Sequence, residues 1–409
     1  MNDDIETLYH DAIFAIGDDD FDDAVDTLNQ MLLIAPDSPY TIEIQGDLAK
    51  SDGQLLEADR YYRRLLETAT DDYWKGVAYT SLGVLWGSAE QGDRVRGYFV
   101  SAVGAFLACG AEDSAVAAYA AIARFDIDQG EFERAIESLQ AAITLFEKST
   151  APDEIESDVG TVRLMLGTCY RQLGKLDQAK PILNEALKVF QKLEEPDQSA
   201  SALDALGILE QIQGDDVAAE KLHLKAVEMN TAIHFQAGLS SNYGNLAILH
   251  IHRSQWDQAA DWAGKAYLID KDNNDENGIA HYHLLMGEIE FERGNTDRAE
   301  DHLQQAAELY KECGDAEDII GVQGKTAVLY RQQGKLDEAS EINERILVEA
   351  ERMGHREGIA AILEDLGQVR KAQGRTEDAR QFWQRSLTLY EELGAQKMIA
   401  QVQQELAGL

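Results

Sequence analysis

A small residue recurs every 40 residues through the second half of this 409-residue chain, and this recurrence limits the folds that the chain can adopt. The first series consists of Gly167, Gly207, Ala247, Gly287, Ala327 and Gly367. A second series with the same step consists of Gly174, Gly214, Ser254, Gly294, Gly334 and Gly374. A third series consists of Ala179, Ala219, Ala259, Ala299, Ala339 and Ala379. Three series in phase indicate a repeat protein in which each unit packs on its neighbours.

Each unit has the pattern of a helical hairpin. The second series places a turn residue, usually glycine, at the end of a first helix, which we call helix A. The third series places an alanine early in a second helix, helix B, where a small side chain allows close packing against helix A. Residues 174–179 and 334–339 are nearly identical copies of this turn. The chain is therefore expected to be all-α.

These hairpins resemble the tetratricopeptide repeat, in which a Leu-Gly pair on helix A is followed by a turn glycine and a small residue on helix B. The pair is present here as Leu166-Gly167, Leu206-Gly207, Met286-Gly287 and Leu366-Gly367. The resemblance covers nearly the whole chain and implies a right-handed superhelical α-solenoid of about ten hairpins with a C-terminal capping helix. The unit length resembles the long-helix variety of kinesin light chain, Leu-Gly-Asn-type adaptors and Rap-like bacterial regulators.

We expect one solenoid over residues 1–409, with repeats of unequal regularity. Irregular repeats 1 to 4 are expected within 1–150, regular repeats 5 to 10 within 156–399, and the capping helix within 400–409. The polar, proline-bearing segment 148–158, where the repeat step lengthens, predicts a longer surface loop or a hinge.

An apolar residue lies two positions after the small residue of every helix A. The ten residues are Phe14, Leu48, Leu85, Phe125, Cys169, Leu209, Leu249, Ile289, Leu329 and Val369. We expect them to form a continuous buried seam, because each hairpin of a repeat array covers the next and no central core is needed.

Charge limits the classes of partner. Asp and Glu outnumber Lys and Arg by 75 to 36, which gives a formal net charge of -39. Nucleic acid and anionic membrane surfaces are therefore disfavoured, because both are bound by clustered Lys and Arg. The start of the chain lacks the features of a signal peptide, and the three cysteines are far apart. A cytoplasmic location is expected.

No catalytic or cofactor motif is present: the sequence lacks a phosphate-binding glycine loop, a nucleophile elbow, an HExxH motif and a dinucleotide fingerprint. We expect no enzyme activity and no cofactor. Seven histidines fall in three consecutive units, namely His223, His234, His250, His252, His281, His283 and His302. A metal site is the alternative, although histidines two apart on a helix point to nearly opposite sides.

The concave face of such a solenoid, lined by helix A, is the expected binding surface. The candidate groove residues are Arg124, Arg171, Ile208, Asn245, Ile248, Ile251, Phe291, Arg331 and Lys371. They suggest an apolar floor with basic flanks, suited to an amphipathic or acidic peptide. In the alternative interpretation, the basic side chains pair with neighbouring carboxylates and the isoleucines pack between repeats.

Comparison with the resembling families argues against two specific binding modes. The lysine of a carboxylate clamp would lie three residues before the small residue, and none is found there. The asparagine ladder of kinesin light chain would lie two residues before it, and only Asn245 occupies that series.

Three functions remain open at this stage. The first is a scaffold or adaptor that binds a protein or peptide in its concave groove. The second is a peptide-responsive regulatory switch similar to the Rap-like sensors. The third is a metal-binding or enzymatic protein that uses the histidine-rich units.

Overall fold

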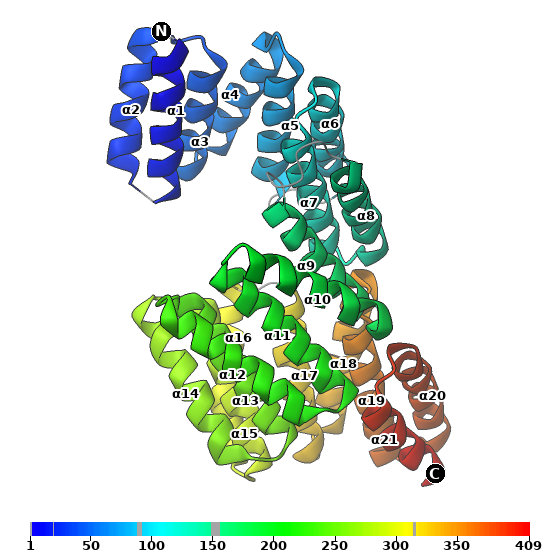
Figure 1. Cartoon of the computed structure of the whole chain (residues 1–409). Helices are drawn as coiled ribbons and strands as arrows, with labels where there is room; N and C mark the ends of the chain where they lie inside the picture. Colours follow the sequence, from blue (N-terminus) through cyan, green and yellow to red (C-terminus); the bar gives the residue numbers. More distant parts are fainter. Residues whose placement is uncertain (1, 19, 88–91, 149–155, 314–315) are drawn as a thin grey trace. The chain divides into compact units, whose positions relative to one another are not determined.

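The computed structural model describes residues 2–18, 20–87, 92–148, 156–313 and 316–409. Over these ranges the chain forms twenty-one α-helices and no strand, which confirms the expected all-α solenoid of ten hairpins and a terminal helix (Figure 1). No helix in the described ranges is long and apolar enough to cross a bilayer. The segment 149–155, which contains most of the loop or hinge expected from the sequence, lies outside the described residues.

The ten hairpins follow one another along the chain. The first five pair α1 (Asn2–Gly17) with α2 (Phe21–Ile34), α3 (Pro39–Ser51) with α4 (Leu55–Thr68), α5 (Asp72–Gly87) with α6 (Asp93–Cys109), α7 (Glu112–Asp128) with α8 (Phe132–Lys148), and α9 (Glu156–Gln172) with α10 (Leu176–Lys192). The next five pair α11 (Pro196–Gln213) with α12 (Asp216–Ala232), α13 (Gln236–His252) with α14 (Trp256–Asp272), α15 (Glu276–Glu292) with α16 (Thr296–Cys313), α17 (Ala316–Gln332) with α18 (Leu336–Met353), and α19 (Arg356–Ala372) with α20 (Thr376–Leu393). The last helix is α21 (Gln396–Ala407).

Internal contacts divide the chain into two compact units. Unit 1 comprises Met1–Gln129 and Glu133–Val162, and unit 2 comprises Gly130–Phe132 and Arg163–Leu409. The division passes through α9. The division by repeat regularity that we inferred from the sequence stays a prediction.

Helix A and helix B approach closely because a glycine on A receives a large side chain from B. A Cβ atom at Gly207 would lie 2.6 Å from the His223 ring, and one at Gly83 would lie 2.6 Å from the Phe99 ring. Where helix A of α13 carries Ala247 instead, the facing position on α14 is Ala263. In these three hairpins the two sizes are matched, as close packing requires.

The backbone turns repeat with the same 40-residue step. Within hairpins, the expected turn residues from Gly174 to Gly374 have a positive φ, including Ser254 at 58°. A second series lies between hairpins, where Glu194, His234 and Asn274 have φ of 57°, 56° and 55°. L-residues adopt this left-handed conformation at a cost, so stacking on both sides must hold these turns.

The apolar seam is buried at nine of its ten positions, from Leu48 to Val369. The expectation was wrong for Phe14, whose side chain is 71% exposed. The physical reason is position: Leu48, Leu85 and Leu249, for example, pack against residues of the hairpin that precedes them, whereas α1 is the first helix described.

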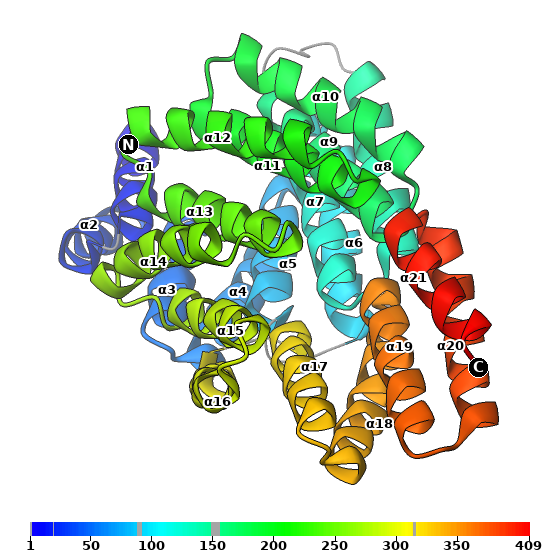
Figure 2. The same ribbon diagram turned by 90° about the horizontal axis from the view of Figure 1, so that it is seen from below.

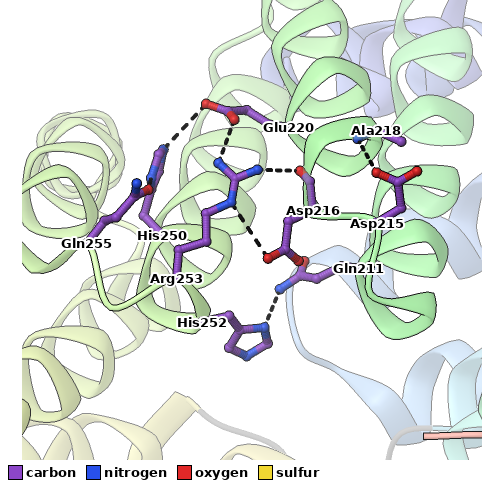
Figure 3. A network of polar contacts seen from close by, with 9 residues as sticks. All are labelled: Gln211, Asp215, Asp216, Ala218, Glu220, His250, His252, Arg253 and Gln255. Carbon is purple, nitrogen blue, oxygen red and sulfur yellow. Dashed lines mark hydrogen bonds and ion pairs between the residues drawn. The ribbon is translucent and has the colours of Figure 1, made fainter. Parts of the chain in front are cut away.

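Polar contacts at the turns join consecutive hairpins of unit 2. Arg253, just after α13, contacts Glu220 of α12 at 2.6 Å and donates to the Asp216 carbonyl oxygen at 2.6 Å (Figure 3). Corresponding contacts join Arg293 to Asp257 at 2.5 Å, Gln333 to Glu300 at 3.0 Å and Gln373 to Asp337 at 3.1 Å. These contacts fix the register of each hairpin on the one before it.

In unit 2 the A helices line the inner side. Helices α11, α13, α15, α17 and α19 each contact the next helix of this series. Figure 2 shows α13, α15, α17 and α19 inside an arc whose outer side is formed by α14, α16, α18 and α20. Side chains of helix A therefore form the surface on which a partner is expected to lie.

The size matching across the hairpin generates a stability prediction. Gly367→Ala is expected to lower the free energy of unfolding by about 1–3 kcal/mol, because its Cβ would overlap the indole of Trp383. The indole is fixed by the hydrogen bond that its Nε1 donates to the Glu364 carbonyl oxygen at 3.0 Å. The matched control is Gly264→Ala within α14, where a Cβ meets no atom within 4 Å. Gly264→Ala should raise the free energy of unfolding by about 0.5–1 kcal/mol. Urea unfolding followed by circular dichroism compares the two variants.

Candidate functional site

One position near the end of helix B is buried beneath the next helix A throughout unit 2. It is occupied in turn by Phe190, Asn230, Asp270, Tyr310, Ala350 and Tyr390, and each side chain is at most 5% exposed. Three of the six are aromatic and fill the joint between hairpins. At the two central joints a short polar side chain takes the place of the ring.

Two adjoining hollows open at these central joints. The hollow beside Asn230 has a volume of about 190 Å³, and Asp204 and Ser241 also line it. The hollow beside Asp270 has a volume of about 370 Å³ and is lined by residues of five helices, including Asn245, His281 and Tyr282. Ala237 and Ser241 line both hollows. We call this surface, formed by Asp204, Asn230, Ser241, Asn245, Asp270 and His281, the central groove.

A chain of hydrogen bonds supports the central groove from beneath. The Nδ1 atom of the fully buried His223 lies 2.6 Å from Oδ1 of Asp204. Asn242 donates to Oδ2 of Asp204 and accepts a hydrogen bond of 2.9 Å from Nδ2 of Asn230. Within the described part of the chain, the buried Oδ1 of Asn230 accepts no hydrogen bond. An unsatisfied acceptor at this depth costs about 1–3 kcal/mol, which a donor from a bound molecule would offset.

Burial changes the ionisation of the groove. Burial raises the pKa of the Asp270 carboxyl above its usual range, and the charge of Asp275 adds to this, whereas a hydrogen bond from Ser240 opposes it. Burial also lowers the pKa of His281, so its imidazole is neutral at pH 7. The groove thus presents a desolvated carboxylate at Asp270 and a neutral imidazole at His281.

The structure places the sequence-predicted residues in different surroundings. Asn245 lines the central groove. Ile251 is 6% exposed and belongs with Ile248 to the apolar cluster between α13, α14 and α15, while Phe291 packs against the cluster around Leu303. Ile208 is half-buried in α11. Of the four apolar candidates, Ile251 is therefore part of the core and the other three are half-buried.

The basic candidates are also dispersed. Arg331 pairs with Asp365 at 2.6 Å, and Lys371 pairs with Glu405 at 2.9 Å. Arg171 is half-buried in α9. Arg124 lines a separate hollow of about 510 Å³ in unit 1. Whether any of these residues binds a partner stays a prediction.

Comparison with known proteins identifies the family. A family model described as tetratricopeptide repeat matches residues 158–232, 238–312 and 318–392, and a second model with this description matches 116–149. These matches span more than half of the chain. The chain belongs to the tetratricopeptide repeat family. It is a helical repeat scaffold, as the sequence pattern predicted.

One curated relative shares part of the chain. Transcription activator GutR of Bacillus subtilis (strain 168) is 23% identical over 208 residues, which are 49% of this chain. The match spans 23% of the length of GutR, less than a quarter of that protein.

Solved structures of Rap proteins share the fold of the tetratricopeptide scaffold. A Rap protein complexed with competence and sporulation factor has a TM-score of 0.64 and 13% identity, over 96% of this chain and 99% of that chain. The Rap conjugation gene regulator of plasmid pLS20, in complex with the Phr* peptide, has a TM-score of 0.61 and 13% identity, over 84% and 95%. Aspartyl phosphate phosphatase F from Bacillus subtilis has a TM-score of 0.58 and 12% identity, over 84% and 92%. At these identities the likeness shows the fold alone.

Sequence reasoning missed most of the central groove of this tetratricopeptide array. Apart from Asn245, the candidate residues lie one or four positions after the small residue of helix A, whereas Asp204 and Ser241 precede that residue by three and six positions. The signal that could have found the groove is the helix B series in which Asn230 and Asp270 interrupt the aromatic residues.

In the described structure, the histidine side chains of these repeats lie in separate surroundings. His281 lines the central groove, and His283 and His302 contact each other through Nδ1 atoms 2.9 Å apart. His250 contacts Gln255 and His252 contacts Gln211 at the turn shown in Figure 3. Among the described residues, no group of three or more His, Cys, Asp or Glu is placed to hold a metal ion.

The raised pKa of Asp270 generates a prediction with a defined sign. At pH 7 the buried carboxylate destabilises the fold, so Asp270→Asn should raise the free energy of unfolding by about 0.5–2 kcal/mol. The folded chain holds the Asp270 proton more tightly than the unfolded chain, so the wild type gains stability as pH falls. The difference in unfolding free energy between Asp270→Asn and the wild type should therefore shrink as the pH is lowered towards the usual pKa range of Asp. Urea unfolding at several pH values measures this. The exposed Asp272→Asn on the same helix is the control, and an equal effect there would contradict the assignment.

Proposed function

We propose that this tetratricopeptide scaffold binds an extended peptide or protein segment in the central groove of unit 2. The groove lies on the inner face formed by the A helices, which is the surface that a solenoid offers to a partner. Its polar groups lie at intervals along three consecutive hairpins. A segment running across α11, α13 and α15 would contact them in turn.

The observation that carries this proposal is the replacement of aromatic residues by Asn230 and Asp270. Each replacement removes apolar burial and leaves a polar group beneath the next hairpin, which lowers stability. Proteins retain such costly groups where they serve binding. The backbone N–H and C=O groups of a peptide match an amide oxygen, a carboxylate and a serine hydroxyl.

The partner's charge follows from the charges that line the central groove. Asp204, Asp270 and Asp275 are acidic, and the nearby carboxylates offset the charges of Arg331 and Lys371. This balance favours a neutral or basic segment. The sequence suggested an acidic or amphipathic segment instead, and the two alternatives predict opposite composition in selected ligands.

We propose further that the chain acts by binding, in the cytoplasm, and without nucleic acid as a partner. The strong negative charge supports the last point. One protein with a similar fold is named aspartyl phosphate phosphatase F, but at 12% identity this name does not assign an activity to the present chain. Hydrolysis of acetyl phosphate by this chain above the buffer rate would contradict the proposal of a purely binding role.

A regulatory switch is the second candidate function. It is favoured by the hydrogen-bond chain from His223 through Asp204 and Asn242 to Asn230, because this chain links both helices of one hairpin to the next helix A. A ligand at Asn230 would therefore change the contacts between hairpins. Such a change is expected to alter the superhelix, because each hairpin contacts only its neighbours.

Blocking the groove tests the main proposal. Peptides selected from a displayed random library on the wild-type chain should bind Ser241→Trp about tenfold more weakly or worse, because the indole would occupy both hollows. Thr388→Trp, on the exposed face of α20, is the control and should bind as the wild type does. Fluorescence anisotropy measures the dissociation constants. Equal binding by the two variants would overturn the groove assignment.

The same peptides separate the remaining alternatives. Enrichment of Lys and Arg would support the acidic groove, and enrichment of Asp and Glu would support the basic flanks expected from the sequence. For the switch, the radius of gyration of the chain from X-ray scattering should change when a selected peptide binds. A radius that no selected peptide changes would remove the switch.

A further inference from the structure

The first hairpin exposes the surface that every later hairpin buries. Phe14 is 71% exposed, whereas the nine corresponding residues of the other hairpins are at most 9% exposed. Where the cluster that buries this residue is described, it includes the preceding helix B: Leu249 packs with Ala219 of α12, and Leu329 packs with Leu303 of α16. The exposed face of α1 and α2 therefore has the shape that elsewhere in this chain receives an α-helix.

The surroundings of Phe14 are acidic. A hollow of about 570 Å³ between α1 and α2 is lined by Phe14 together with Asp11, Asp18, Asp23 and Asp26. These four carboxylates form no ion pair with any Lys or Arg in the described ranges. No Lys or Arg precedes Lys50 in the sequence, so this negative charge has no basic neighbour on its own hairpin.

Two positions on this face carry polar residues where other hairpins carry apolar ones. Asp11 takes the position of the leucine in the Leu-Gly pair, and Thr27 takes the position filled by Ile182, Leu222 and Trp262 in other hairpins. Polar residues at these two positions would suit a cap that merely ends the array. Phe14 does not fit that role, because a cap gains nothing from a large apolar side chain left in water.

We infer that this end face, formed by Phe14, Asp11, Asp18, Asp23 and Asp26, binds an amphipathic helix of a partner protein that carries Lys or Arg beside its apolar residues. The helical shape follows from what covers the same face of the other hairpins. The basic character follows from the four carboxylates. A second copy of this chain is a poor occupant, because its first hairpin is equally acidic and its net charge is -39.

The probe for the test is a synthetic helical peptide of 17 residues with the apolar pattern of α10 and Lys at its flanking positions. A matched peptide carries Glu at those positions. Binding to the full chain is measured by fluorescence anisotropy at low and high salt. The Lys peptide should bind, its affinity should fall as the salt concentration rises, and the Glu peptide should not bind.

Three variants locate the binding. Phe14→Ser should weaken binding of the Lys peptide about tenfold or more. The pair Asp11→Asn and Asp26→Asn should weaken it and flatten its salt dependence. Val348→Ser, which removes another exposed apolar side chain, from α18, is the control and should bind as the wild type does. Circular dichroism verifies that each variant is folded.

Three results would overturn the inference. The first is equal binding of the Lys peptide by Phe14→Ser and Val348→Ser. The second is equal binding of the Lys and Glu peptides by the wild type. The third is concentration-dependent self-association that Phe14→Ser abolishes, because the face would then belong to a second copy. Ser241→Trp should leave this binding unchanged, so the outcome is independent of the central groove.

Discussion

The close approach of helix A to helix B is the interaction on which the rest of the structure depends. A hairpin of two helices buries little surface by itself, so its stability comes from the fit within the hairpin and from the next hairpin stacked on it. The fit is set by pairs such as Gly207 with His223, Gly83 with Phe99 and Gly367 with Trp383. In unit 2 such pairs recur at 40-residue steps, so successive hairpins of that unit present the same faces to each other.

The middle of unit 2 departs from this regular packing. Where Phe190 and Tyr390 complete the stacking of one hairpin on the next, Asn230 and Asp270 leave space and uncompensated polarity. The turn contacts of Arg253 with Glu220 and of Arg293 with Asp257 join the same hairpins across these two joints and so help to offset the cost. A repeat array tolerates a weak joint of this kind because its stability is a sum over neighbours and no single core is interrupted.

Repetition explains both the success and the limits of the sequence-based predictions. The fold could be predicted because the small residues at 40-residue steps report a local requirement that each hairpin meets separately. The site could not, because its properties depend on contacts between hairpins. The pairing of Arg331 with Asp365 joins residues 34 apart, and the exposure of Phe14 depends on which hairpin lies before it. Neither the ion pair nor the exposure can be predicted from the residue pattern of a single repeat. Asn245, which lines the central groove, is also a candidate from the sequence because it occupies a recognisable series on helix A.

The left-handed turns between hairpins have a consequence for how the array comes apart. At the last two joints a glycine adopts this conformation readily, but at the three joints that flank the central groove it is imposed on Glu194, His234 and Asn274. Those three residues keep it only while both adjoining hairpins remain stacked. If one hairpin detaches, the turn relaxes and can no longer direct the other back into register. Separation at the groove would then spread along the chain as a cooperative event, whereas the glycine joints near α20 would let single hairpins detach and return.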